Sequence, residues 1–125
     1  MTIIIFIIII ILNYNAGKLL LDCVESIFKS DYKNFEVIIV DNRSKDSSHK
    51  ECQRKYEQII LIENSENLGF CEGNNVGIRK AKGDFLIILN PDTIVKEMLK
   101  KMRWDCIILQ RKGEYVGIIT YWDFL

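Results

Sequence analysis

The sequence predicts an α/β fold whose mainly parallel sheet carries helices on both faces. Apolar runs with the composition of buried strands cover Ile3–Leu12, Phe35–Asp41 and Phe85–Leu89. Segments with helical spacing separate them, and strands that alternate with helices fold as right-handed β-α-β units with parallel strands. The length of 125 residues corresponds to one domain.

The first run, Ile3–Leu12, contains ten apolar residues, whereas a membrane-spanning helix needs about 20. No Lys or Arg precedes it, as one would in a signal peptide. Because most of its residues are β-branched isoleucines, we interpret it as a strand buried on both faces. A membrane anchor is the alternative interpretation.

The segments between the strands contain helix signals. Apolar residues at helical spacing predict a helix over 18–30, with one face formed by Leu20, Cys23, Val24, Ile27 and Phe28. Ser48 and Glu51 have the spacing of a capping box, which predicts a second helix that runs to about Tyr56. A third short strand is expected around Gln58–Glu63, and a third helix over Cys71–Ala81 despite two internal glycines.

The composition excludes several classes of function. Hydrophobic residues make up 49% and charged residues 27%, as in ordinary globular proteins. Because 17 basic residues balance 17 acidic ones, no net positive field would attract nucleic acid. The four widely spaced cysteines indicate free thiols rather than a zinc site or a disulfide framework. The only histidine, His49, is expected on the solvated side of a helix.

The predicted topology places three loops at one edge of the sheet. In open parallel sheets, ligands bind at the carboxyl ends of the strands, where the strand order changes direction. The loops after the first, second and fourth strands, which contain Asn13–Asn15, Asp41–Asp46 and Asn90–Asp92, should therefore line one crevice. The first of these loops has a lone Gly17 and neither a GxGxxG nor a GxxxxGK[ST] motif, which argues against NAD and ATP.

A divalent metal offers another way to hold a nucleotide diphosphate. Mg²⁺ and Mn²⁺ prefer oxygen ligands and often take only one or two carboxylates together with substrate phosphates. In FLIILNPDT, residues 85–93, Asp92 follows a buried strand and the only proline, Pro91. The sequence therefore predicts that Asp92 is held rigidly at a metal site.

Three segments resemble family-2 glycosyltransferases, in particular their rhamnosyltransferase-like branch. They read ILNYNAGKLLLDCVESI, FEVIIVDNRSKDSS and ENLGFCEGNNVGIRKAKGDFLIILNPDT, and together they cover about residues 4 to 98. The resemblance implies an incomplete GT-A fold, which is Rossmann-like, and inverting transfer from a nucleotide-diphosphate sugar with Mg²⁺ or Mn²⁺. Hexosyl or rhamnosyl transfer from a UDP- or dTDP-sugar to a polysaccharide, lipid-linked or protein acceptor is expected.

The resemblance also implies roles for individual residues. Asp92 matches the metal-binding acid, and Asn90 replaces the first acid of the DxD motif found in other members, which should weaken metal binding in the absence of the diphosphate. Asp41 matches the aspartate that pairs with the nucleotide base. The remaining residues implied around the donor are Asn13, Asn15, Asn42, Ser44, Asp46, Asn67, Gly69, Phe70, Asn74 and Asn75. On their own, the aspartates and asparagines are equally typical of turns and helix caps.

The resemblance fades near Leu99, and residues 99–125 are expected to form a divergent tail. We predict a nucleotide-sugar-binding domain over residues 1–98, an amphipathic helix over Ile94–Arg103, and a strand, hairpin and strand after it. The final residues fit either the next strand of the family or the end of a CBS module, whose pattern would place Thr120 and Asp123 near a ribose. No residue can be nominated as the general base that inverting transfer requires.

Activity of the chain alone therefore stays open. One alternative is a non-catalytic fragment that binds nucleotide-sugars, and another is an inert gene remnant whose exposed sheet edge pairs with a second copy. We expect a cytoplasmic protein with no nucleic-acid partner. Peripheral membrane contact through the basic helix and homo-oligomers are further options.

Overall fold

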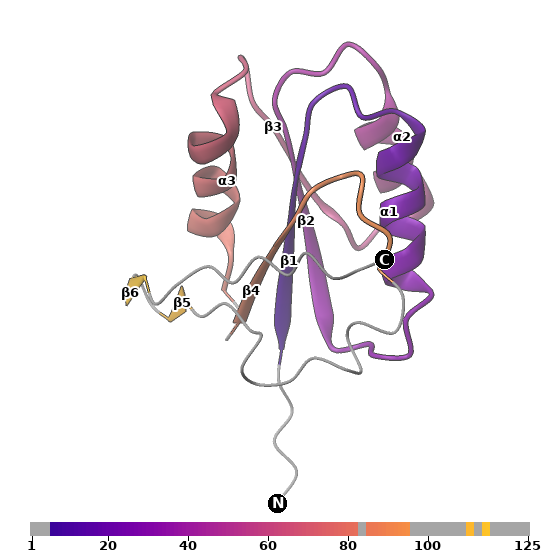
Figure 1. The fold of residues 1–125 in the computed structure, drawn as a ribbon, viewed down its shortest axis with the longest axis vertical. Coiled ribbons are helices and arrows are strands. Elements are labelled where there is room, and N and C mark those ends of the chain that lie inside the picture. The colour runs from indigo at the N-terminus through magenta and orange to yellow at the C-terminus, as the bar shows by residue number, and fades with distance from the viewer. Residues whose placement is uncertain (1–5, 83–84, 96–109, 112–113, 116–125) are drawn as a thin grey trace, which may run out of the picture.

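The computed structural model describes residues 6–82, 85–95, 110–111 and 114–115 (Figure 1). Strands and helices alternate in the main part of the chain, as predicted. The elements are β1 (Ile7–Asn13), α1 (Lys18–Phe28), β2 (Phe35–Asp41), α2 (Ser48–Lys55), β3 (Ile60–Glu63), α3 (Gly69–Lys80), β4 (Phe85–Leu89), β5 (Gln110–Arg111) and β6 (Glu114–Tyr115).

Four parallel strands form one sheet in the order β3-β2-β1-β4. Helices α1 and α2 cover one face of the sheet and α3 covers the other (Figure 1). The predicted Rossmann-like α/β fold is thereby confirmed. The strand order changes direction at β1, because the chain adds β2 and β3 on one side of it and β4 on the other.

Strand β1 is buried on both faces, because its side chains alternate between two hydrophobic clusters. Ile7, Ile9 and Ile11 pack with the buried residues of α1 and α2. Ile8 and Ile10 pack on the opposite face with residues of β2 and α3. The isoleucine run is thus explained by a central strand that shows little surface to water.

Helix α3 approaches the sheet closely through two glycines one turn apart. A Cβ atom at Gly73 would lie 2.6 Å from Leu12 Cδ1, and one at Gly77 would lie 2.7 Å from Ile10 Cγ2. Both distances are shorter than side chains tolerate. Each glycine weakens a free helix by about 1 kcal/mol, but here that cost is offset by packing of the helix backbone on the strand residues.

Several predicted boundaries differ from the structure. Helix α3 begins at Gly69 rather than Cys71, and β3 begins at Ile60 rather than Gln58. The predicted capping box is wrong: α2 begins after Ser47 without a side-chain cap, and the Ser48 hydroxyl instead donates to Asp46 Oδ1 at 2.7 Å. The preceding aspartate offers a charged acceptor, which competes successfully with the helix end.

Part of the predicted tail lies outside the described residues. Ile94 and Val95 are not helical, and the rest of the predicted helix is outside. Gln110–Arg111 and Glu114–Tyr115 form a short antiparallel pair, which agrees with the predicted hairpin. Thr120 and Asp123 are outside the described residues. Within the described part, no helix combines the length and apolar character needed to cross a bilayer.

Candidate functional site

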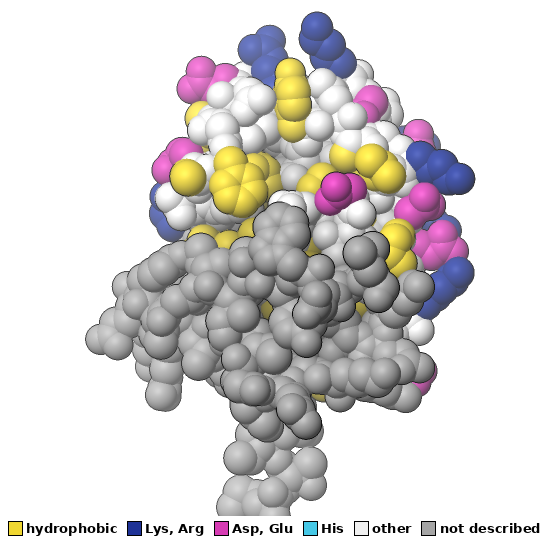
Figure 2. Space-filling view, viewed as in Figure 1, with side chains coloured by type: hydrophobic (Ala, Val, Ile, Leu, Met, Phe, Trp, Pro, Cys, Tyr) yellow, Lys and Arg dark blue, Asp and Glu magenta, His cyan; other side chains and the backbone are white. Residues whose placement is uncertain are grey.

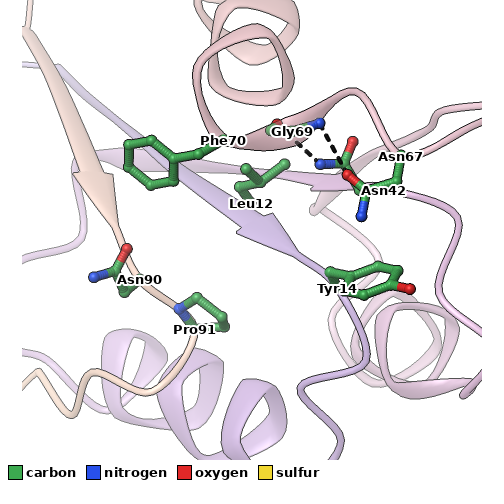
Figure 3. Close-up of a pocket in the computed structure, with 8 residues that line it drawn as sticks. All are labelled: Leu12, Tyr14, Asn42, Asn67, Gly69, Phe70, Asn90 and Pro91. Carbon is green, nitrogen blue, oxygen red and sulfur yellow. Dashed lines mark hydrogen bonds between the residues drawn. The ribbon is translucent and has the colours of Figure 1, made fainter.

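An open pocket of about 330 Å³ lies at the carboxyl edge of the sheet (Figure 3). The end of β1, the residue after β2, the start of α3 and the turn after β4 all contribute to it, so the loops expected at one crevice do meet there. The residues that line the pocket are Leu12, Tyr14, Asn42, Asn67, Gly69, Phe70, Asn90 and Pro91.

Strand register aligns polar residues in one row beside this pocket. Asn13 is opposite Asp41 in the β1–β2 pair, and Asp41 is opposite Glu63 in the β2–β3 pair. Asn13 and Asp41 are nevertheless buried, at 0% and 2% exposure. Neither residue lines the pocket; their side chains are buried behind it and are bonded to each other.

Asp41 accepts hydrogen bonds from several neighbours. Asn13 Nδ2 donates to its Oδ1 at 2.9 Å, the Ser44 hydroxyl donates to the same oxygen at 2.7 Å, and the Ser44 N–H donates to Oδ2 at 2.8 Å. A buried carboxylate needs such donors because it has lost its hydration. In this structure Asp41 and Ser44 hold the loop after β2, and their predicted contact with a nucleotide stays a prediction.

His49 is buried, with 3% exposure, so its expected position on a solvated surface is wrong. Its Nδ1 lies 3.3 Å from Asp41 Oδ1 without hydrogen-bond geometry, and its Nε2 lies 3.2 Å from Glu63 Oε1. The imidazole ring therefore sits between two carboxylates from the ends of β2 and β3. The sequence does not reveal this burial because Asp41 and Glu63 come together beside α2 only when β2 and β3 pair in the folded sheet.

The loops after β1 and β2 are joined by hydrogen bonds. Asn15 N donates to Ser44 Oγ at 2.8 Å, and Asn15 Oδ1 accepts from Lys45 N at 2.7 Å. Asp46 Oδ2 accepts from Gly17 N at 3.0 Å. Burial alone would raise the pKa of Asp46, but hydrogen bonds from Ser48 and Gly17 lower it below its ordinary value.

The start of α3 is tied to the end of β2 through Asn42. Its Nδ2 donates to Gly69 O at 3.1 Å, while Asn67 Oδ1 accepts from Gly69 N at 2.9 Å (Figure 3). Gly69 has φ +80°, a conformation that side chains disfavour, and a Cβ there would meet nothing within 4 Å. The Gly69 backbone is thus held by hydrogen bonds, and the space beside its Cα atom is open.

Two exposed aromatic side chains line the pocket, Tyr14 at 53% and Phe70 at 64% exposure. Figure 2 shows hydrophobic side chains at the surface of the same end of the molecule. Asn74 is buried and donates to Phe70 O at 3.0 Å, and its Oδ1 has no hydrogen-bond partner in the described part of the chain. Asn75 is exposed on α3, and its side chain helps to lower the pKa of Glu72, after the larger effect of Arg79.

Asn90, Pro91 and Asp92 form a turn after β4 that is closed by a hydrogen bond from Thr93 N to Asn90 O at 3.1 Å. Asn90 and Asp92 are exposed. The Asp92 carboxylate has no hydrogen bond or ion pair with any side chain or backbone group that the structure describes. One carboxylate and one amide oxygen are hard ligands, which fit a divalent cation that also binds ligand oxygens.

The described residues do not form a metal site made of protein side chains alone. Among the described residues, no group of three His, Cys, Asp or Glu side chains is placed to hold a metal ion. The donor set at this turn therefore suits a cation that shares its coordination with a bound anion, and does not suit a closed structural site.

Sequence reasoning identified Asn42, Asn67, Gly69, Phe70 and Asn90 among the residues that line the pocket. It missed Leu12, and it expected the loop Asn13–Asn15 at the crevice without singling out Tyr14. Strand alternation could have revealed both, since Tyr14 lies two residues beyond Leu12 and the intervening Asn13 is buried. Pro91 was expected to stiffen the turn and also lines the pocket.

The sequence is similar to those of known glycosyltransferases. The profile of glycosyl transferase family 2 matches residues 8–121, which include most of the tail. Glycosyltransferase GlyG of Streptococcus pneumoniae serotype 4 is 34% identical over 114 residues, which cover 89% of this chain and 37% of GlyG.

Solved structures agree on the fold. Mannosyltransferase PcManGT from Pyrobaculum calidifontis, in complex with GDP-Man and Mn²⁺, has a TM-score of 0.71 at 23% identity over 78% of this chain and 31% of its own. S. aureus TarS 1-349, in complex with UDP, has a TM-score of 0.69 at 26% identity over 76% of this chain and 30% of its own. The chain thus spans about a third of the length of these proteins. By sequence and by fold, it belongs to glycosyl transferase family 2.

Proposed function

We propose that this chain forms the donor-binding part of an inverting glycosyltransferase, and that its pocket takes a UDP- or dTDP-sugar together with Mg²⁺ or Mn²⁺. The sugar, a hexose or deoxyhexose, would be transferred to a polysaccharide, lipid-linked or protein acceptor. Support comes from membership of the family, and from TarS and PcManGT, which are solved with UDP and with GDP-Man and Mn²⁺.

The observation that carries this proposal is the contrast between the two sides of the pocket. One side presents apolar and amide surface from Leu12, Tyr14 and Asn42, which suits a nucleoside. The other side ends in the Asn90–Asp92 turn with an exposed carboxylate. A ligand with an uncharged ring system and an anionic, metal-binding group fits both sides at once.

When bound, a divalent cation would neutralise the diphosphate and stabilise the charge that develops on the leaving nucleotide. The residues of the chain then have separable tasks. Asp92 supplies a carboxylate oxygen, Gly69 leaves its backbone accessible, and Phe70 and Tyr14 shield the ligand from water. Asp92 itself is not among the lining residues but directly follows Pro91, which is. We assign its carboxylate to the cation, and because the described lining contains no other carboxylate, we assign no general base.

The test is calorimetric titration of the purified chain with UDP, dTDP and GDP, each with Mn²⁺ and with EDTA. We expect UDP or dTDP to bind more tightly with Mn²⁺, and we expect Asp92→Ala to weaken that binding by about tenfold or more, since a charged ligand to the cation is lost. Affinity in EDTA should change little in this variant.

Asp31→Ala is the matched control, because it removes an exposed aspartate from the loop that precedes β2, at the opposite edge of the sheet. It should bind UDP as the unchanged chain does. If the folded chain gives no heat with any nucleotide, the donor-site proposal is wrong. A chain that binds UDP-sugar but transfers nothing to any acceptor would instead support the non-catalytic alternative.

A further inference from the structure

Helix α1 is bonded to the segment after β4 through Ser26, across 69 residues of sequence. Val95 N donates to Ser26 Oγ at 2.9 Å, and the Ser26 hydroxyl donates to Cys23 O at 2.6 Å. The hydroxyl proton is thus used within the helix, which leaves an oxygen lone pair for the distant N–H. Val95 is itself buried at 4% exposure and Ser26 is half-buried, so this bond is partly shielded from water.

A second contact from the same helix reaches the turn itself. Cys23 Sγ lies 4.0 Å from Asn90 O, the carbonyl that also accepts from Thr93 N. Burial raises the pKa of the Cys23 thiol to about 12, with smaller contributions from Cys52 and Asp92, and the N–H of Thr93 opposes this shift. The thiol therefore stays neutral and can donate to the carbonyl.

Together these contacts bracket Asp92. The turn that contains Asp92 is closed by the bond from Thr93 N to Asn90 O, and Asn90 O also contacts Cys23. Three residues after Asp92, the backbone N–H of Val95 is bonded to Ser26. Figure 1 shows the segment after β4, in orange, passing from the strand end to α1. No hydrogen bond or ion pair to a described group holds the carboxylate, so only its backbone fixes its position.

We infer that Ser26 is a positioning residue that holds the Asn90–Asp92 turn so that Asp92 faces the cation of a bound nucleoside diphosphate. This inference rests on the proposed function. It assigns to α1, which does not line the pocket, control over the metal-dependent part of ligand binding. Nucleoside contacts lie on the other side of the pocket and do not depend on this bond.

The experiment compares Ser26→Ala, Ser26→Thr and Ser30→Ala in the full chain, by UDP titration with Mn²⁺ and with EDTA. Ser26→Thr keeps a hydroxyl at the same place. Ser30→Ala is the matched control: Ser30 follows α1 and accepts a local hydrogen bond from Tyr32 N at 3.2 Å, outside the segment after β4.

We expect Ser26→Ala to weaken UDP binding in Mn²⁺ by about fivefold, the usual effect of one lost hydrogen bond, and to leave binding in EDTA within about twofold. Ser26→Thr should recover most of the loss, and Ser30→Ala should behave like the unchanged chain. Two results for Ser26→Ala would overturn the inference. An equal loss of UDP affinity with and without Mn²⁺ would show that Ser26 supports the fold alone, and an unchanged affinity would show that Ser26 does not affect binding.

Amide hydrogen exchange of the free protein separates this inference from the proposed function. In Ser26→Ala, exchange at Val95 should become faster while exchange at residues of β2 stays unchanged. Unchanged exchange at Val95 would overturn the inference even if UDP binds. If Val95 responds but the unchanged chain shows no Mn²⁺-dependent binding, the proposed function fails, and with it the assigned role of Asp92.

Discussion

Two aspartates follow strands at the same edge of the sheet, yet their surroundings are opposite. Asp41 is 2% exposed and accepts hydrogen bonds from Asn13 and from both donors of Ser44. Asp92 is exposed, and its carboxylate has no bonded partner in the described part of the chain. An aspartate after a strand can therefore serve the fold or remain available to a ligand, and the sequence pattern alone does not separate these roles.

The difference follows from the neighbouring segments. The loop after β2 is bonded to the end of β1 and the residues after it, so that Asp41 is surrounded by donors of the protein itself. The turn after β4 is held through backbone atoms, which leaves its carboxylate unused. A carboxylate already bonded by several donors gains little from a cation, whereas a solvated one can exchange water for it.

The largest effect should come from Asp41→Ala. Its removal leaves Asn13 Nδ2 and the Ser44 donors without their buried acceptor, so we expect the free energy of unfolding to fall by about 3 kcal/mol. Asp92→Ala is the control at the other strand end, and it should stay within about 0.5 kcal/mol of the unchanged chain. Urea denaturation measures both. Equal effects of the two substitutions would remove the distinction drawn between these aspartates.

His49→Ala should have an intermediate effect. The substitution leaves a cavity and removes the side chain that links Glu63 to the region of Asp41, so a loss of about 2 kcal/mol in unfolding free energy is expected. Lys50→Ala changes the next residue, whose side chain is 61% exposed, and should cost under about 0.5 kcal/mol. If both variants unfold at the same urea concentration, the buried histidine contributes nothing beyond a surface residue.

Asp46 should have the smallest effect, and that effect should depend on pH. Its folded pKa is lowered from the ordinary 3.8, so the ionised form stabilises the fold. This contribution is complete above the unfolded pKa and disappears as the pH falls through the lower folded pKa. The difference in unfolding free energy between the unchanged chain and Asp46→Asn, followed from about pH 6 to about pH 3, should therefore shrink.

A difference that stays constant over this range would show that Asp46 acts through its shape rather than its charge. Glu57→Gln provides the control for general charge effects, because that glutamate is exposed between α2 and β3 rather than between the loops after β1 and β2.

The sequence by itself determined the α/β class, the burial of the isoleucine run on both faces and the edge of the sheet where a site would form. These follow from local patterns: a strand buried on both faces must be apolar throughout, and parallel strands bring their carboxyl ends together. Motif resemblance named Asn42, Asn67, Gly69, Phe70 and Asn90, which do line the pocket.

Only the tertiary structure decided which polar residues face inward. The burial of His49 depends on β2 and β3 lying side by side, and the bond between Ser26 and Val95 joins segments that no local pattern connects. The same holds for Gly73 and Gly77, which do not stabilise the helix but allow it to pack closely on β1. Such contacts depend on long-range packing, which short-range propensity does not encode.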